Sequence, residues 1–514
     1  MTQAAAGPAP DAVAVTDAVA TGDLLATHAG DTPWVVAGEP TTPAELDRRA
    51  GRVAAGLLGL GLEPGAHVCL MMRASIGSLA AWFGIARAGL VEVPLNTATR
   101  GHLLEHLLAH SRATVVVTDR EFLPLIEAAR PPRVRHVLVT EDDLPGLDGD
   151  PARLPTVDPD ATAVILYTSG TTGPPKGVRL SHRTGVWLAR RVVSLMDYTA
   201  ADRLYSVFPL FHSNARFTSV LPALLVGGGL VLDRHFSASR FWGTCREHGI
   251  TVFNFQGAML SLLHGRPELP DDADNPVRAG FGAPCPPEIV DDVERRFGIR
   301  LTEIYGSTEA PLIVEGPPGT RRLGAAGRPA AGHEVRVVDP AGEEVPAGEV
   351  GEIVCRPRVP GALFSGYHDM AEETVHAWRG LWFHTGDRGR IDADGYLYFV
   401  DRLSDSIRRR GENISSWEIE RAVLTHPAVE AVAAYGVASA LSEEDVMVAV
   451  VLAPGQRVDA AGIAAHCAGR VTEFAVPRYV RFVDALPLTP SQRTEKYVLR
   501  DAGVTADTWD REAR

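Results

Sequence analysis

A loop rich in small and hydroxyl-bearing residues follows an apolar segment and carries one lysine. Residues 163–182 run AVILYTSGTTGPPKGVRLSH, and the apolar segment Ala163–Tyr167 is typical of a buried strand. Glycine N–H groups and side-chain hydroxyls can surround a phosphate, and Lys176 adds a positive charge. The spacing differs from G-x-x-x-x-G-K-[ST], which excludes the P-loop of common NTPases. A flexible surface turn is the alternative. The predicted phosphate contacts are Thr168, Ser169, Gly170, Thr171, Thr172, Gly173 and Lys176.

This loop resembles that of the adenylate-forming superfamily, which contains acyl-CoA synthetases, luciferases and the adenylation domains of peptide synthetases. The resemblance extends over nearly the whole chain, through several motifs in the same order. Within the superfamily, the segments PLNTATRG, HFSASRFW, DDADNPVR and FGAP are most similar to carnitine/crotonobetaine-CoA ligase-like enzymes. The resemblance implies an enzyme that uses ATP and Mg²⁺, with coenzyme A as a co-substrate.

A second motif, IYGSTEA at residues 304–310, follows an apolar strand. The resemblance implies that Tyr305 packs against adenine, Thr308 contacts phosphate and Glu309 helps to hold Mg²⁺. A flat ring suits a purine, and a carboxylate suits a hard cation that bridges phosphates. Taken alone, the segment would be interpreted as an ordinary turn, but its place after the glycine-rich loop favours a functional role. The remaining predicted nucleotide contacts of this motif are Gly306 and Ser307.

Two further segments resemble the parts of the superfamily that hold adenine and ribose. FGAP at 281–284 is similar to the stretch whose backbone lies along adenine, which implies roles for Gly282, Ala283 and Pro284. Residues 382–402 resemble the ribose-binding segment, in which Asp387 would accept hydrogen bonds from both hydroxyls and Arg402 would lie near the same sugar. The alternatives are a tight glycine turn and a solvated aspartate.

The segment FPLFHSN at 208–214 resembles the motif whose histidine gates the acyl pocket. In the next stretch Arg216 stands among apolar and small residues, and Gln256 lies in VFNFQGAML, which we expect to form a strand and a pocket wall. We predict that these polar groups recognise a polar or charged acid. The alternatives are a core histidine, a snorkelling Arg216 and a surface Gln256. The predicted acid pocket comprises His212, Asn214, Arg216, Gln256 and Ala310.

The C-terminal signature departs from the superfamily pattern T-P-[ST]-G-K. Here the chain has LPLTPSQRTEKYVLR, so Gln492 and Arg493 stand where Gly-Lys is expected. Arginine is a permanent cation and can stabilise the charge that develops on phosphorus, although its planar group is wider than an ammonium. Lys496 is the alternative cation. We predict that Arg493 takes the catalytic role.

Two positions are predicted to serve the step that transfers the acyl group from its adenylate to coenzyme A. Ser404 occupies the hinge position of the superfamily, where aspartate or lysine is usual. RRRGENIS at 408–415 resembles the loop that faces the active site during thioester formation, and Gly411 would let the pantetheine arm pass close to the backbone. The run Arg408–Arg410 is either a contact for coenzyme A or, as we favour, a solvated face.

The elements that must position these residues alternate between strands and helices. Residues 65–71 and 113–118 have strand patterns, whereas 43–60 and 102–111 have helical spacing, which predicts an α/β fold with largely parallel sheets. Short strands and turns follow from about 333. A helix near 416–425 and strands near 429–437 and 446–453 predict a small, mobile α+β domain. The predicted divisions are a loose tail 1–20, a large domain 21–402 with a β-rich subdomain at about 325–402, and a small domain 403–514.

Composition narrows the class of protein and its partners. The chain has 514 residues and a net charge of −14, which argues against nucleic acid as a partner. Five scattered cysteines form no zinc or disulfide pattern. No basic n-region precedes an apolar core, and no apolar run reaches about 18 residues, so we expect no signal peptide and no membrane span. We predict a cytoplasmic monomer or homodimer.

Three functions are consistent with these residues. The first is an AMP-forming acyl- or aryl-CoA ligase that activates a small carboxylic acid as its adenylate, with polar and aromatic acids as the candidates. The second is an adenylating enzyme of secondary metabolism whose second step is amide formation or nitrite-dependent diazotisation. The changed lysine position and Ala310-Pro311, where related ligases often have Thr-Gly, keep this alternative open. The third, least favoured, is a nucleotide-binding remnant without catalysis.

Overall fold

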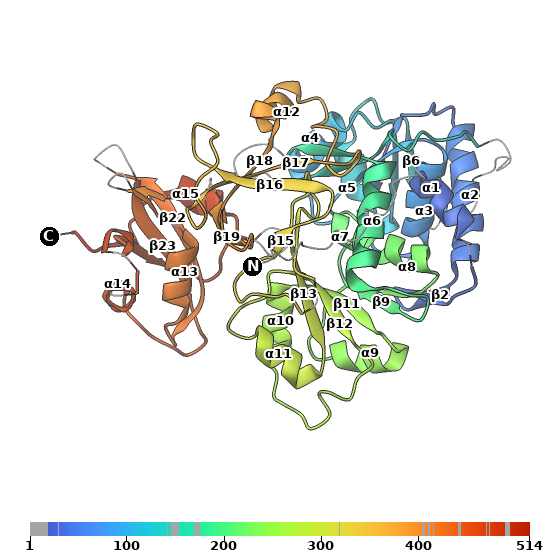
Figure 1. The fold of residues 1–514 in the computed structure, drawn as a ribbon. Coiled ribbons are helices and arrows are strands. Elements are labelled where there is room, and N and C mark those ends of the chain that lie inside the picture. Colours follow the sequence, from blue (N-terminus) through green and yellow to red (C-terminus); the bar gives the residue numbers. More distant parts are fainter. Residues whose placement is uncertain are drawn as a thin grey trace, which may run out of the picture.

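The computed structural model contains two large sheets with helices around them, a smaller antiparallel sheet and a C-terminal sheet with its own helices, which lies at the left of Figure 1. The described residues are 19–28, 30–140, 142–144, 147, 154–168, 175–317, 319–402, 407–409, 412–414, 416–439, 444–468, 470–471, 473–488 and 494–513. The α/β fold with a β-rich segment and a small C-terminal α+β part, as predicted, is confirmed.

The first large sheet has six strands in the order β6-β5-β3-β4-β7-β8. Neighbouring strands from β6 to β7 are parallel, and only β8 runs antiparallel, to β7. Helices α4 and α5 cover one face, and α2 and α3 pack into the core on the other. The bounds are β3 His67–Met71, β4 Val91–Pro94, β5 Val115–Thr118, β6 His136–Val139, β7 Thr162–Tyr167, β8 Gly177–Ser181, α2 Pro43–Gly59, α3 Ile76–Arg87, α4 Gly101–His110 and α5 Leu123–Ala129.

The second large sheet has nine strands in the order β15-β14-β13-β12-β11-β9-β10-β1-β2, and β13 to β1 are parallel in this order. One core joins the inner faces of the two large sheets. Its strands are β1 Trp34–Val36, β2 Glu39–Thr41, β9 Arg203–Ser206, β10 Gly229–Leu232, β11 Val252–Gln256, β12 Ala279–Ala283, β13 Arg300–Tyr305, β14 Val314–Glu315 and β15 Arg328–Pro329. The helices that accompany it are α1 Thr21–Thr27, α6 His182–Met196, α7 Ser213–Ala215, α8 Leu221–Val226, α9 Phe241–His248, α10 Gly257–His264 and α11 Val290–Phe297.

Helix α6 illustrates how local sequence sets these elements. The Ser181 hydroxyl accepts a hydrogen bond from the N–H of Thr184 at 3.1 Å, which satisfies a free donor of the first turn. Val192 and Met196 are buried one helical turn apart. The helix ends at Asp197, whose φ of 49° is left-handed.

An antiparallel sheet of four strands follows in the order β16-β17-β18-β19. Its elements are β16 His333–Val338, β17 Gly351–Pro357, α12 Ala371–Ala377, β18 Phe383–Ile391 and β19 Leu397–Arg402. Residues from Ile407 onward bury hydrophobic clusters of their own, separate from the large core. The C-terminal elements are β20 Ile407–Arg409, β21 Glu412–Ile414, α13 Ser416–Leu424, β22 Val429–Ala438, β23 Glu444–Leu452, α14 Ala460–Cys467, β24 Tyr479–Phe482, α15 Lys496–Ala502 and β25 Trp509–Asp510. The domain boundary at 402–404 stays a prediction.

Two local expectations differ from the structure. The run VFNFQGAML is a strand only to Gln256, and α10 begins at Gly257, where a Cβ atom would lie 2.9 Å from the carbonyl oxygen of Pro284. Of the predicted tail, residues 1–18 are not among the described ones, and Ala20 is 1% exposed beside α1.

Within the described ranges no helix has both the length and the apolar character needed to cross a bilayer. All five cysteines are buried free thiols.

Candidate functional site

The predicted nucleotide and acid contacts gather at the carboxyl edge of the nine-stranded sheet. Strands β13, β12 and β11 are neighbours and end at Tyr305, Ala283 and Gln256. The next parallel strand, β9, leads into the segment that holds His212 and Asn214. Ligands of open α/β sheets bind outside the carboxyl ends of the strands. Residues far apart in the sequence therefore face one binding region.

Close packing explains two glycines at this edge. A Cβ atom on Gly282 would lie 2.0 Å from the carbonyl oxygen of Phe255. A Cβ atom on Gly306 would lie 2.4 Å from the backbone nitrogen of Leu312. Both positions exclude a side chain, because backbone atoms of the neighbouring segment cannot move aside without breaking the sheet or the turn. Pro284 follows directly after β12.

A hydrogen bond and an ion pair join three predicted residues, here named the Asp387 cluster: Tyr305, Asp387 and Arg402. The Tyr305 hydroxyl donates to Asp387 Oδ2 at 2.7 Å, and Arg402 Nε lies 3.3 Å from Asp387 Oδ1. Asp387 and Arg402 are register partners on β18 and β19. Burial, and then the neighbouring carboxylate, raise the pKa of Tyr305, so the phenol keeps its proton. The cluster thus presents a carboxylate and a cation beside an aromatic ring.

A second group, the Glu309 cluster, contains Glu309, Ser307, Tyr367 and Lys176. The Tyr367 hydroxyl donates to Glu309 Oε1 at 3.1 Å, and the Ser307 hydroxyl donates to Glu309 Oε2 at 3.0 Å. Lys176 Nζ lies 5.0 Å from the centre of the Tyr367 ring. Burial, and then Glu309, raise the pKa of Tyr367. Half-buried Thr308 lies in the same turn.

Lys176 and Thr168 close the base of the glycine-rich loop. The backbone N–H of Thr168 donates to the carbonyl of Lys176 at 3.0 Å, and β7 and β8 continue this pairing. The loop therefore starts and ends beside the Glu309 cluster. The predicted contacts Ser169, Gly170, Thr171, Thr172 and Gly173 lie outside the described residues.

The Glu309 cluster fits a Mg²⁺ ion that is held mainly by phosphate. Within the described part of the chain, no group of three or more His, Cys, Asp or Glu residues has the arrangement of a metal site. Mg²⁺ in nucleotide sites takes one or two carboxylates together with phosphate oxygens and water. Glu309 supplies one such carboxylate, and Ser307 and Tyr367 fix its orientation.

The predicted acid pocket lies against a buried polar network. Asn254 is 2% exposed, and its amide donates to Asn214 Oδ1 at 2.8 Å and to Thr218 Oγ1 at 2.6 Å. Gln256 is two residues further along β11, on the same face of the strand, and half-buried. His212 is half-buried at the start of α7. Ala310 is fully buried, and its carbonyl accepts from the Ser307 N–H at 3.0 Å.

The predicted role of Arg216 in recognising the acid is corrected by its contacts. Arg216 is 1% exposed, so it does not snorkel, and its guanidinium forms an ion pair with Glu92, which is equally buried. It also lies over the Trp82 ring at 4.6 Å and donates to the carbonyl of Leu210. The charge that we expected to recognise a substrate is therefore neutralised inside the protein. Arg216 begins a short π-helical segment, Arg216–Val220, within the helical stretch.

Breaking this ion pair is expected to destabilise the large domain. Arg216→Met leaves the Glu92 carboxylate buried without a counter-charge, which costs about 3–5 kcal/mol of unfolding free energy. The double variant Glu92→Leu/Arg216→Met removes both charges and should recover most of that loss. Urea unfolding followed by circular dichroism measures both. A single variant as stable as the parent would contradict the role assigned to the pair.

The alternative catalytic cation, Lys496, is engaged within the C-terminal part. Its Nζ atom lies 2.8 Å from Glu420 Oε1 and donates to the Ser416 hydroxyl at 2.7 Å. Among the described residues these are its polar contacts, and both lie on α13. The other predicted residues of the C-terminal part, Arg493, Ser404 and Gly411, lie outside the described residues.

The sequence-based prediction missed two residues. Tyr367 lies 58 positions from Glu309, and nothing in its local sequence, FSGYHD, indicates that contact. Glu303 stands beside Gly282 in the sheet, two residues before Tyr305. Burial raises the pKa of Glu303 to about 7, opposed by hydrogen bonds with Cys285 and by Arg321. A charged residue within the apolar strand LTEIY was the available signal for Glu303.

The chain is similar to known proteins over most of its length. Residues 4–368 match the family described as AMP-binding enzyme, and residues 418–493 match its C-terminal domain. Crotonobetaine/carnitine–CoA ligase of Salmonella typhimurium is 32% identical, covering 89% of this chain and 92% of that protein. Sulfoacetate–CoA ligase of Cupriavidus necator is 34% identical, covering 91% and 94%. ATP-bound MatB from Rhodopseudomonas palustris has a TM-score of 0.85 at 29% identity, covering 94% and 98%.

Proposed function

Since the chain belongs to the AMP-binding enzyme family, we propose that it joins a small carboxylic acid to coenzyme A and cleaves ATP to AMP and pyrophosphate. The observation that carries the proposal is the meeting of the Asp387 cluster, the Glu309 cluster and the acid-pocket residues at one sheet edge. In the proposed reaction these groups would serve as a ribose acceptor, a phosphate-side cation and an acid pocket.

In the first step, a carboxylate oxygen of the acid attacks the α-phosphorus of ATP. The bond from that phosphorus to the β-phosphate oxygen breaks, and pyrophosphate leaves. Asp387 accepts from the ribose hydroxyls, while Tyr305 and the backbone of Gly282 and Ala283 line the adenine. Lys176 stabilises the departing charge. Positioning and electrostatics account for such catalysis, because the protein supplies no covalent partner.

In the second step, the thiolate sulfur of coenzyme A attacks the acyl carbon, and AMP leaves with the bonding electrons. Mg²⁺, when bound through Glu309, would neutralise charge on the phosphate oxygens. We propose that residues 403–514 move about Ser404 between the two steps, with Gly411 on the path of the pantetheine arm and Arg493 serving the first step.

We further propose that the acid is small and polar. The two relatives are named for crotonobetaine or carnitine and for sulfoacetate. In this chain the buried amide of Asn254, with Asn214, lies beside half-buried Gln256 at the end of β11. A polar wall of this kind favours a substrate that can hydrogen-bond, because an apolar acid would leave Gln256 without partners.

One assay tests the whole proposal. The protein is mixed with MgATP and a library of small acids, with and without coenzyme A, and AMP, pyrophosphate and acyl products are measured by mass spectrometry. We expect acid-dependent pyrophosphate release and a thioester only with coenzyme A. Product formation with an amine or nitrite would instead support an adenylating enzyme whose second step is amide formation or diazotisation. Tight ATP binding without turnover would support a nucleotide-binding remnant without catalysis.

Asp387→Ala is expected to raise the Michaelis constant for ATP about 10- to 100-fold, because a hydrogen bond to a charged group contributes about 1.5–3 kcal/mol. Tyr305→Phe is the matched control. It removes one hydroxyl but keeps the ring, so the expected loss is less than about 10-fold. ATP titration of pyrophosphate release distinguishes them. Equal effects of the two changes would argue against a ribose contact at Asp387.

A further inference from the structure

A cavity of about 670 Å³ lies at the amino ends of three parallel strands of the six-stranded sheet. His67 of β3, Val91 of β4 and Thr162 of β7 line it. Ile165, further along β7, also lines it, and the glycine-rich loop leaves β7 after Tyr167, two residues beyond Ile165. The volume is that of a typical small-molecule pocket. The proposed two-step reaction makes no use of this cavity.

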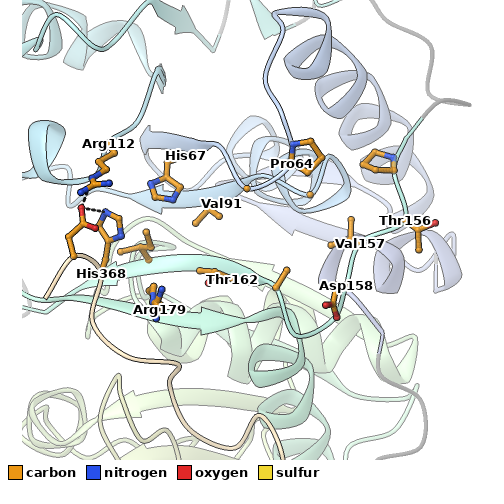
Figure 2. Close-up of a pocket in the computed structure, with 16 residues that line it drawn as sticks. Pro64, His67, Val91, Arg112, Thr156, Val157, Asp158, Thr162, Arg179 and His368 are labelled. Atoms are coloured by element: carbon orange, nitrogen blue, oxygen red, sulfur yellow. Dashed lines mark ion pairs between the residues drawn. The ribbon is translucent and has the colours of Figure 1, made fainter. Parts of the chain in front are cut away.

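The two ends of the cavity differ in chemistry. Figure 2 shows Arg112, His67, His368 and Arg179 toward one end, with Thr156, Val157 and Asp158 at the other. Pro64, Val91 and Val157 give the cavity an apolar wall. Asp158 is thus at the end away from the basic groups, whereas Asp369, which also lines the cavity, lies beside Arg112 and His368.

At the basic end, Arg179 carries a charge that the described residues leave unbalanced. Its Nη2 donates to the carbonyl of Ser365 at 3.1 Å, while its buried Nε has no hydrogen-bond partner among the described residues. No carboxylate of the described ranges forms an ion pair with it. Arg112, in contrast, is paired with Asp369 at 2.5 Å. An unpaired, half-buried guanidinium is costly, and an anion would offset that cost.

The histidines at this end are fixed by backbone carbonyls. His67 Nδ1 donates to Ser111 O at 2.6 Å, and His368 Nε2 donates to His110 O at 3.1 Å. The two rings are 5.1 Å apart. Each neutral ring has therefore used its one N–H, and the remaining nitrogen can donate to an anion only after it takes up a proton.

Burial lowers the pKa of the His368 imidazole, which favours its neutral form. The charge on Asp369 opposes this effect, whereas the neighbouring rings of His67 and His110 add to it. Arg112 and Arg179 also line this end. A bound anion adds a negative charge beside the ring, which favours the protonated form.

We propose that this cavity binds an organic carboxylate, with its charged group beside Arg179, His67 and His368 and its apolar body against Pro64, Val91 and Val157. The apolar wall favours an organic anion over inorganic phosphate. Binding takes up protons, so the affinity falls as the pH rises from 6 to 8. The proposal does not depend on which acid the catalytic site activates.

Isothermal titration of the full chain with benzoate tests this site. We expect saturable binding whose measured enthalpy changes with the ionisation enthalpy of the buffer, in the sense of proton uptake. Arg179→Gln should weaken it at least about 10-fold, the loss of one charge-assisted contact. Ala161→Trp, at an exposed lining position, should block it by size without touching Arg179. Arg133→Gln, an exposed control, should change nothing.

Benzoate can also enter the proposed acid pocket, so Gln256→Trp, which narrows that pocket, separates the two. Binding that survives Gln256→Trp, but is lost in Arg179→Gln and Ala161→Trp, supports the cavity. Four results would overturn the proposal: no saturable binding, binding unaffected by both cavity variants, equal binding of neutral benzamide, or binding of phosphate without benzoate.

Discussion

Replacing Glu309 with glutamine is expected to lower the rate constant of acyl-adenylate formation by about 10²- to 10³-fold, the usual cost of removing one group that stabilises transition-state charge. The amide is nearly isosteric and can keep one hydrogen bond from Tyr367 or Ser307. It cannot supply negative charge to Mg²⁺. The variant should therefore need more Mg²⁺ for half-maximal rate while its fold stays intact.

Ser307→Ala provides the matched control for this prediction. It removes one hydrogen bond to the Glu309 carboxylate but leaves the charge, so the rate should fall less than about 10-fold. Pyrophosphate release is measured at saturating ATP over a series of Mg²⁺ concentrations. If Glu309→Gln keeps the parent rate and Mg²⁺ dependence, the cation is held elsewhere, and the role of the Glu309 cluster would have to be abandoned.

Helix and strand bounds could be predicted most accurately where one local sequence pattern determines the structure. Helix α2 was predicted at 43–60 and runs Pro43–Gly59, because Thr42 and Pro43 begin it and its apolar residues repeat at helical spacing. The buried strands at 65–71 and 113–118 were predicted within two residues at each end. The parallel arrangement of such strands brings their carboxyl ends together, so the approximate place of the binding edge also followed from the sequence.

Contacts between distant segments could not be predicted in this way. Arg216 and Glu92 are 124 residues apart, and a charged residue in an apolar stretch has the same pattern whether it meets a substrate or a buried partner. Tyr367 meets Glu309 only because the segment after β17 returns to the glycine-rich loop, where Tyr367 pairs with Val178. The close approach that leaves no room for a side chain at Gly257 likewise involves Pro284, a neighbour in space only.

The unusual C-terminal signature leaves a choice between two cations, and the contacts of Lys496 bear on it. Glu420 and Ser416 hold its ammonium, and its side chain is 14% exposed. Recruiting it to phosphate would leave Glu420 without this partner and would cost the ion pair and a hydrogen bond, about 1–3 kcal/mol together. This cost favours Arg493, which lies three residues earlier at the position of the superfamily lysine.

Arg493→Ala is therefore expected to slow acyl-adenylate formation by about 10²- to 10³-fold with little change in stability. Arg493→Lys should recover part of the rate, because a cation is restored without the planar guanidinium. Lys496→Met should lower the rate less than about 10-fold and act mainly by destabilising the C-terminal part, since Glu420 loses its ion pair. Single-turnover pyrophosphate release gives the rates, and thermal unfolding gives the stabilities. A rate lost in Lys496→Met but kept in Arg493→Ala would reverse the assignment, because the reaction would then depend on the ammonium now bound to α13.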